Sequence, residues 1–240
     1  MSEWKKKRFW KTVSVAETPD GFEIRLDNRS VKTPSKANLC MPTRMLAEAV
    51  AEEWEAQVEN IQPETMPLTR AANSAIDKIM PQQAEVAALI ADYGGTDLLC
   101  YRAAAPVELV ARQAEAWDPV LKWSEEELGV ALKTTTGIVY VPQPEKSIHT
   151  LNGLVHAMTP FQLAGFHDLV SITGSLIVGL AVSKKFLSVD ELWFRARIDE
   201  SWQEEQWGKD DEASETAELK RLSFHNAAKF HFLSSDRNYL

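Results

Sequence analysis

The sequence predicts an α+β protein, in which a small N-terminal antiparallel β domain is followed by a larger, mostly α-helical domain. Up to about residue 42, apolar and polar side chains alternate between turn-forming residues, as they do in short half-buried strands. From Thr43 onward, apolar residues recur at spacings of three and four, which is the helical period. We therefore expect a β-rich domain at 1–42, a connecting helix and proline-containing elbow at 43–67, and an α-helical domain at 68–240.

Four short strands account for the β domain. Large and polar side chains alternate over 8–17, and "PDG" at 19–21 is a turn sequence. The apolar residues of 22–26 then lie on one face of a second strand. Two shorter strands, around Val31 and over 39–41, complete a sheet whose apolar face must pack against another element.

The rest of the chain is predicted to be mostly helical. Thr43 is placed to cap the first helix, in which the apolar residues from Leu46 to Trp54 share one face. Pro63 and Pro67 then interrupt the helical pattern. Later helices are expected at 68–80, 81–93, 106–128, 145–157, 160–185, 189–207 and 212–233, with one strand-like segment at 131–141.

Charge and hydropathy exclude several classes of protein. A net charge of −9, with one tight basic run at 5–8, disfavours nucleic-acid binding. The longest uncharged apolar run, 169–182, is shorter than the about 20 residues of a membrane-spanning helix, so no membrane insertion is expected. Cys40 and Cys100 match no ligand pattern and are predicted to be small buried thiols. With no apolar signal segment, we expect a soluble, cytoplasmic protein.

The usual motifs of enzymes and nucleotide-binding proteins are missing from the sequence. Glycine is scarce, at 10 of 240 residues, and no dinucleotide-binding or phosphate-binding glycine motif occurs. No G-x-S-x-G motif occurs either, and Ser175 in "TGSLIVG" is expected inside an apolar helix whose small residues allow close packing. We therefore predict no catalytic residue, no metal site and no cofactor.

One enzymatic alternative stays open at this point. His156, the pair His167-Asp168 and Asp199 occur in an order that resembles the HD-type metal-dependent phosphohydrolases. The residues that flank the pair are apolar, and neighbouring helical residues point about 100° apart. Histidines on a helix surface, or satisfied histidines in the core, are therefore favoured over a metal site. A small-molecule-binding regulatory domain is a third possibility, disfavoured because no ligand-binding loop is recognisable.

An acidic stretch near the C-terminus raises a sharper question. The residues "DESWQEEQWGKDDEA", from Asp199 to Ala213, contain seven carboxylates and two tryptophans. On one continuous helix, Glu200 and Gln203 would lie between Trp193 and Trp207, on the face expected to be buried. A buried carboxylate needs a partner. The candidates are Arg70, Arg102 and Arg197 within the chain, or a cation of a partner protein.

Eight motifs, in order, resemble one protein family. They are "RFWKTVSV", "GFEIRLDNRSVKTP", "LAEAVAEEWEAQ", "IQPETMPLTRAANSAID", "TDLLCYRA", "WDPVLKW", "TGSLIVGLA" and "DESWQEEQWG". Together they span about 8–228, and the series resembles the ATP12 family, assembly chaperones of the F1 part of ATP synthase. The resemblance implies a small β-rich N-terminal domain and a helical C-terminal domain, in agreement with the pattern of the residues.

The resemblance also implies a function. Members of the family are not enzymes; they bind the unassembled F1 α subunit and shield the surface that later meets the β subunit. Eukaryotic members act in the mitochondrial matrix, and this chain looks like a bacterial cytoplasmic member. In the family, an acidic residue of the "DE-x-W-Q" segment is associated with chaperone activity, and Glu200 matches it.

These inferences lead to one predicted partner-binding surface. We expect it on the helix from Trp193 to Trp207, with contributions from "CYRA" at 100–103 and from the helix that contains Trp54. A few aromatic anchors inside a polar, acidic rim are typical of such an interface. The protein is expected to be a monomer. The predicted partner-binding residues are Glu200, Gln203, Trp207, Trp193, Trp54, Tyr101 and Arg102.

Overall fold

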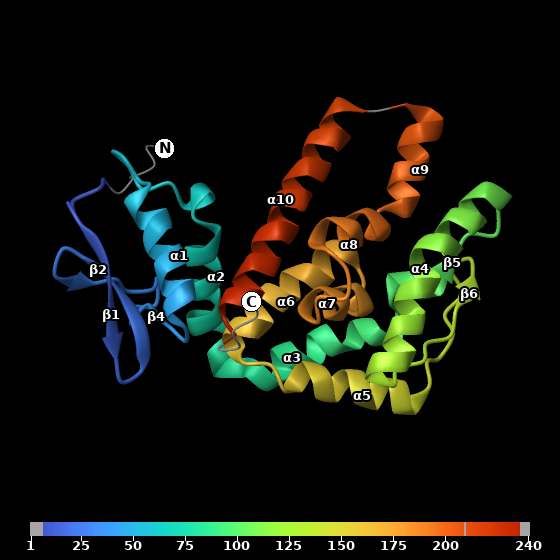
Figure 1. Cartoon of the computed structure of the whole chain (residues 1–240), viewed down its shortest axis with the longest axis horizontal. Coiled ribbons are helices and arrows are strands. Elements are labelled where there is room, and N and C mark those ends of the chain that lie inside the picture. The colour runs from blue at the N-terminus through green and yellow to red at the C-terminus, as the bar shows by residue number, and fades with distance from the viewer. Residues whose placement is uncertain (1–6, 209, 236–240) are drawn as a thin grey trace. The chain divides into compact units, whose positions relative to one another are not determined.

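The computed structural model describes residues 7–208 and 210–235, and the chain forms two compact units (Figure 1). Unit 1 contains the described parts of Met1–Gln83, Thr159–Gly165 and Lys229–Leu240, so the chain returns to it twice. Unit 2 contains Ala84–Met158 and the described parts of Phe166–Ala228. Lys5 and Lys6 of the basic run, and Lys209 of the acidic stretch, lie outside the described residues.

Unit 1 contains the predicted antiparallel sheet. Its strands are β1 (Val13–Thr18), β2 (Gly21–Leu26), β3 (Arg29–Ser30) and β4 (Cys40–Met41). β2 pairs with the other three strands, and its register with β1 places Ile24 opposite Val15. One face is apolar as expected, because Ile24, Leu39 and Met41 are fully buried. The predicted fold class, a small N-terminal antiparallel sheet and a larger helical region, is confirmed.

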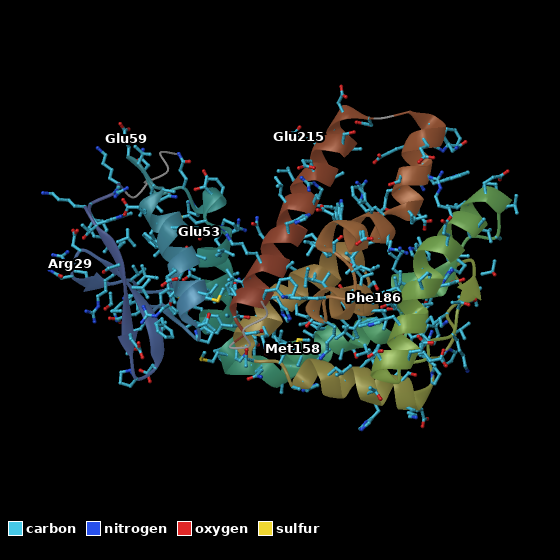
Figure 2. The ribbon with its side chains drawn as sticks, viewed as in Figure 1. Arg29, Glu53, Glu59, Met158, Phe186 and Glu215 are labelled. Carbon is cyan, nitrogen blue, oxygen red and sulfur yellow. The ribbon has the colours of Figure 1, made fainter. Side chains whose placement is uncertain are left out.

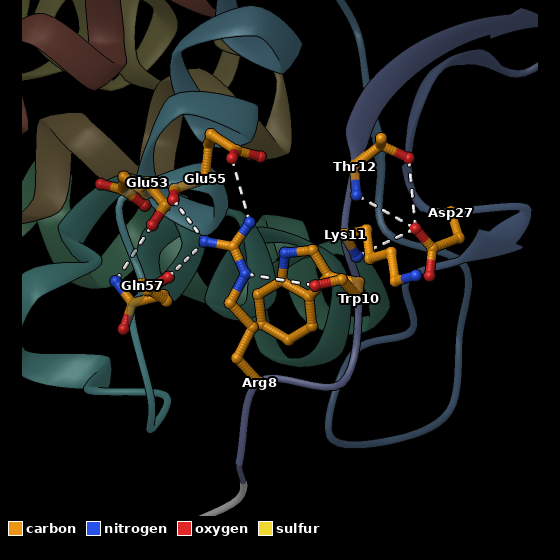
Figure 3. A network of polar contacts seen from close by, with 8 residues as sticks. All are labelled: Arg8, Trp10, Lys11, Thr12, Asp27, Glu53, Glu55 and Gln57. Carbon is orange, nitrogen blue, oxygen red and sulfur yellow. Dashed lines mark hydrogen bonds and ion pairs between the residues drawn. The ribbon is translucent and has the colours of Figure 1, made fainter.

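Helix α1 (Arg44–Glu55) packs against this sheet and buries Leu46 and Val50. Thr43 caps it as predicted, because the Thr43 side chain accepts a hydrogen bond from the backbone N–H of Leu46. The end of α1 is held by Arg8, whose guanidinium donates to the Glu55 carbonyl at 2.8 Å and pairs with the Glu55 carboxylate at 3.0 Å (Figure 3). Arg8 thereby satisfies a carbonyl that lacks a helical partner.

A half-buried carboxylate, Glu53 of α1, caps the start of the next helix. After a 3-10 turn at Pro63–Thr65, α2 (Pro67–Ser74) starts with free backbone N–H groups. The Glu53 carboxylate accepts hydrogen bonds from the N–H groups of Leu68 and Thr69 at 2.7 and 2.8 Å, and from the Thr69 hydroxyl at 2.7 Å. Burial raises the pKa of Glu53. The helix predicted at 68–80 therefore starts as expected, and it continues through a π-helical turn at Ala75–Ile79 and a 3-10 turn at Met80–Gln82.

Unit 2 is built mainly from helices. Within it lie α3 (Gln83–Ala91) apart from its first residue, α4 (Val107–Leu128), α5 (Glu145–His156), α7 (Leu176–Ser183), α8 (Val189–Ala196) and α9 (Ile198–Trp207). Helices α6 (Pro160–Thr173) and α10 (Asp211–Leu233) have residues in both units. Short 3-10 turns occupy Asp92–Gly95 and Leu98–Cys100. Among the described residues, no helix has the length and apolar character needed to cross a membrane.

The elements predicted at 160–185 and at 131–141 are wrong. The helix expected at 160–185 is divided, because Gly174 adopts a positive φ of 69° between α6 and α7. Ser175 is therefore not inside a helix; its hydroxyl caps α7 by accepting from the N–H of Val178 at 3.0 Å. The strand expected at 131–141 is reduced to β6 (Thr135–Thr136), which pairs in parallel with β5 (Tyr101–Arg102).

The buried residue Asp97 explains why the helix is interrupted between α6 and α7. Its carboxylate is completely buried and accepts from the Ser175 hydroxyl at 2.7 Å, the Ile177 N–H at 2.9 Å and the Leu99 N–H at 3.0 Å. The carboxylate thereby satisfies N–H groups in the first turn of α7 and in the turn that follows Asp97. Burial raises the pKa of Asp97 to about 6. Cys100, a free thiol, is also buried, which raises its pKa to about 12.

Candidate partner-binding surface

The segment predicted as one helix at 189–207 consists of two helices. It divides at Arg197, whose backbone leaves the helical region with φ −113° and ψ 24°. The Arg195 carbonyl, which in a continuous helix would accept from the N–H of Asp199, accepts instead from the indole N–H of Trp117 at 2.7 Å. The Asp199 carboxylate accepts from the Gln113 amide at 2.6 Å. Side chains of α4 therefore impose the break.

Despite the break, four predicted residues line one open hollow. The hollow has a volume of about 720 Å³ and lies between α8, α9 and the first part of α10, all within unit 2. We call it the contact hollow. It is lined by Trp193, Glu200, Gln203 and Trp207, together with Ile172, Thr173, Ala196, Arg197, Glu204, Gly208, Asp210, Glu212, Ala213, Thr216, Ala217 and Lys220.

The expected burial of Glu200 and Gln203 is wrong. Both side chains are exposed, because α9 starts anew after Arg197 and contributes no fully buried residue to the core. Glu200 forms no ion pair with any residue that the structure describes. Arg197, one of its predicted partners, pairs instead with Glu204 at 3.0 Å. Glu200 thus contributes an unpaired charge to an open surface.

The two tryptophans of the contact hollow differ in their environments. Trp193 is only 3% exposed; it packs against Phe224 with ring centroids 5.6 Å apart, and it carries Arg197 over its face. Trp207 is 87% exposed at the end of α9. A large exposed indole is costly to leave in water and is typical of a binding anchor. Trp193 therefore forms the wall of the hollow, whereas Trp207 is available to a partner.

Helix α9 is attached to α4 on its other side. Arg112 of α4 stacks over the ring of Trp202, with its guanidinium 5.0 Å from the centroid, and pairs with Glu205 at 2.7 Å. The hydrogen bond from Arg112 lowers the pKa of Glu205. This attachment holds the opposite face of α9 against the fold, so that Glu200 and Trp207 remain on the open side.

The remaining predicted contact residues occupy other places. Arg102 is half-buried on β5, where it pairs with Asp118 at 2.8 Å and stacks over Trp117, so its charge is satisfied within the fold. Tyr101 neighbours it and is also half-buried. Neither residue lines the contact hollow. Trp54, on α1 of unit 1, is half-buried and packs edge-on against Trp10. Arg70, a further predicted partner of Glu200, belongs to unit 1.

One exposed apolar segment was not predicted. Ile138, Val139 and Tyr140 follow β6 in sequence and are 94%, 69% and 58% exposed. The residues "TGIVYV" carry this signal, but they lie within the strand-like segment predicted at 131–141. Gly137, with a positive φ of 80°, ends the pairing with β5 and leaves the segment in solvent. Three consecutive exposed apolar residues form a second candidate contact surface in unit 2.

The residues of the enzymatic alternative do not form a metal site. His167 and Asp168 are exposed and pair with each other at 2.9 Å, and this hydrogen bond raises the pKa of His167. His156 is exposed on α5, and Asp199 is used by Gln113. Over 7–208 and 210–235, no group of three or more His, Cys, Asp or Glu side chains is placed to hold a metal ion.

Comparison with known proteins gives consistent results. The family model described as "ATP12 chaperone protein" matches residues 7–125. The crystal structure of Atp12 from Paracoccus denitrificans superimposes with a TM-score of 0.94 at 45% identity, over 97% of this chain and 100% of that chain. A solved protein from Agrobacterium tumefaciens gives a TM-score of 0.92 at 38% identity, over 95% of this chain and 86% of its own. The mitochondrial protein atp12 of Schizosaccharomyces pombe is 26% identical over 221 residues, 87% of this chain and 76% of its own length.

Proposed function

Because the chain belongs to the ATP12 family of chaperones for F1-ATP synthase assembly, we propose that it binds the unassembled F1 α subunit and shields the surface that later meets the β subunit. The family consists of chaperones, not enzymes. The observation that supports a binding role best is the contact hollow with its exposed Trp207 and unpaired Glu200.

The form of the contact hollow suits a temporary partner. Trp193, which forms part of its wall, is buried, whereas Glu200, Gln203 and Trp207, which also line it, are exposed. An aromatic anchor with a polar rim gives a specific contact of moderate affinity. Such an affinity allows an incoming β subunit to displace the chaperone, whereas a deep apolar interface would hold the α subunit too tightly to release it.

The physical need for a chaperone follows from subunit chemistry. An α subunit without its β neighbour exposes an interface that is buried after assembly, and such surfaces promote aggregation. A chaperone that covers the interface until the β subunit binds prevents this aggregation. We further propose that the protein acts as a monomer in the bacterial cytoplasm, and that Tyr101, Arg102 and Trp54 make secondary contacts.

A co-purification experiment tests this function. The F1 α subunit is produced without β, with and without the chaperone, and the soluble α fraction and its capture on tagged chaperone are measured. We expect the chaperone to raise soluble α and to retain it, and added β to release it. An α subunit that stays insoluble and uncaptured at every chaperone concentration would contradict the proposal. Capture of the β subunit in place of α would contradict the proposal that the α subunit is the partner.

A further inference from the structure

Three tryptophans of unit 2 share one arrangement. In each case an arginine guanidinium lies over the indole and also pairs with a carboxylate at 2.7 to 3.0 Å. The sets are Trp117 with Arg102 and Asp118, Trp202 with Arg112 and Glu205, and Trp193 with Arg197 and Glu204.

The chemistry of arginine explains the repetition. A guanidinium is planar, so it stacks on an indole through its face and still donates hydrogen bonds from its edge to a carboxylate. Tryptophan and carboxylate together therefore form a receptor for arginine. Lysine fits such a receptor less well, because its compact ammonium group has no planar face.

Trp207 and Glu200 are a further indole and carboxylate of unit 2, and no arginine among the described residues joins them. Both line the contact hollow and both are exposed. They lie seven residues apart on α9, which puts them on the same face, about 10 Å apart along the helix axis. Among the described residues, no cation lies over Trp207 and none pairs with Glu200.

The cations that line the hollow do not fill this receptor. Arg197 is already stacked on Trp193 and paired with Glu204. Lys220 of α10 lines the hollow, but it forms no ion pair with Glu200. Counted over the residues that the structure describes, the lining contains four acidic residues and two basic ones, a balance that favours binding of a further cation. The acidic residues are Glu200, Glu204, Asp210 and Glu212.

From this pattern we infer that the contact hollow receives an arginine side chain of the client, stacked on Trp207 and paired with Glu200. The inference rests on the proposed function, because it specifies what the α subunit presents to the hollow. Gln203, between the two residues on the same face, is placed to accept a further hydrogen bond from the same guanidinium.

The test measures the affinity of purified α subunit for the immobilised full-length chaperone. The variants are Glu200→Lys, Glu200→Gln, Trp207→Ala and Trp207→Phe, with Glu215→Lys as the matched control. Glu215 is an exposed residue of α10 (Figure 2). Other residues of α10 line the hollow, but Glu215 does not. We expect about tenfold weaker binding for Trp207→Ala and at least that for Glu200→Lys, with little change for Trp207→Phe and none for the control.

A second arm identifies the arginine. Surface arginines of the α subunit at its β-facing interface are replaced singly by alanine and by lysine. One of them should weaken binding to the wild-type chaperone about tenfold, and should have no additional effect on Trp207→Ala. Added salt should weaken wild-type binding more than binding by Glu200→Gln, because the ion pair is screened.

Each result supports or overturns the inference. If wild-type chaperone captures α and Trp207→Ala captures it equally well, the receptor is wrong while the proposed function stands. The receptor is also wrong, and the proposed function again stands, if no arginine substitution in α loses its effect on binding when it is combined with Trp207→Ala. If the wild-type protein captures no α at all, the proposed function fails, and the inference fails with it.

Discussion

Asp97 and Glu200, two carboxylates of unit 2, lie at opposite extremes of burial and partnership. Asp97 has no exposed surface and is surrounded by donors from two segments of the chain. Glu200 is exposed at an open hollow and has no ion-pair partner among the described residues. The carboxylate that the fold needs is completely satisfied within it, whereas the one that we propose for partner binding has no ion-pair partner among the described residues. The comparison predicts opposite results when each residue is changed.

The largest effect is expected at Asp97. Replacing it in Asp97→Ala leaves the Ser175 hydroxyl and the N–H groups of Leu99 and Ile177 buried without an acceptor. We expect the free energy of unfolding to fall by about 3 to 5 kcal/mol. Denaturant unfolding measures it, with Asp92→Ala, an exposed aspartate of the same unit, as the control. Equal stability of the two variants would show that the Asp97 network is dispensable.

A smaller loss is expected at Glu53, the half-buried carboxylate of unit 1. Glu53→Ala removes the acceptor for the first N–H groups of α2 and for the Thr69 hydroxyl. The expected cost is about 2 kcal/mol of unfolding free energy. Glu52→Ala, at the exposed neighbouring position of α1, should cost less than about 0.5 kcal/mol. A similar result for both would contradict the capping role.

The pH dependence of stability tests the burial of Asp97. Its pKa is about 6 in the folded protein, above the ordinary value of 3.8, so the folded state holds the proton more tightly than the unfolded state. This contribution is complete below the ordinary pKa and is lost as the pH rises through about 6. Between about pH 5 and pH 7.5, the wild type should lose about 1 kcal/mol relative to Asp97→Asn. Parallel pH profiles of the two proteins would contradict the raised pKa.

The smallest effect on stability is expected at Trp207. The side chain is 87% exposed, so Trp207→Ala should change the free energy of unfolding by less than about 0.5 kcal/mol. Trp193→Ala, on the same hollow, removes a buried indole and should cost about 3 kcal/mol or more. Thermal unfolding of the two variants compares them directly. A large loss at Trp207 would mean that it belongs to the core of the fold.

The local sequence was sufficient to predict the antiparallel sheet of unit 1. The alternation of apolar and polar residues over 13–26 and the turn sequence between them predicted the hairpin, and Thr43 predicted the start of α1. Hairpins and helix caps can be predicted in this way because they depend on contacts between residues close in sequence. The helical nature of the remaining chain was also predictable. The period of three and four is a property of each helix by itself.

The two helix breaks could not be predicted in the same way. The break at Gly174 depends on Asp97, which is more than seventy residues earlier in the chain. The break at Arg197 depends on Trp117 and Gln113 of α4. Both arise from tertiary hydrogen bonds that replace helical ones, and a pattern of apolar spacing does not report them. The continuous helix assumed for Glu200 was wrong for this reason, and so was its expected burial.

Residue spacing nevertheless placed the main candidate residues together. One hollow is lined by Trp193, Glu200, Gln203 and Trp207. Although the helix is interrupted at Arg197, the residues of α9 among them still face the same side as Trp193. The role of each could not be assigned from sequence. Burial distinguishes Trp193 from Trp207, and only the neighbouring side chains show that Arg197 is taken by Glu204.

The most direct test of the account compares Glu200→Lys with Glu215→Lys in one measurement of α-subunit capture. Both changes reverse an exposed charge in unit 2, and both should leave the thermal unfolding midpoint unchanged. We predict that Glu200→Lys captures at most about a tenth of the α subunit that the wild type captures at limiting concentration. Glu215→Lys should capture as much as the wild type. Equal capture by both folded variants would contradict the claim that the contact hollow binds the client.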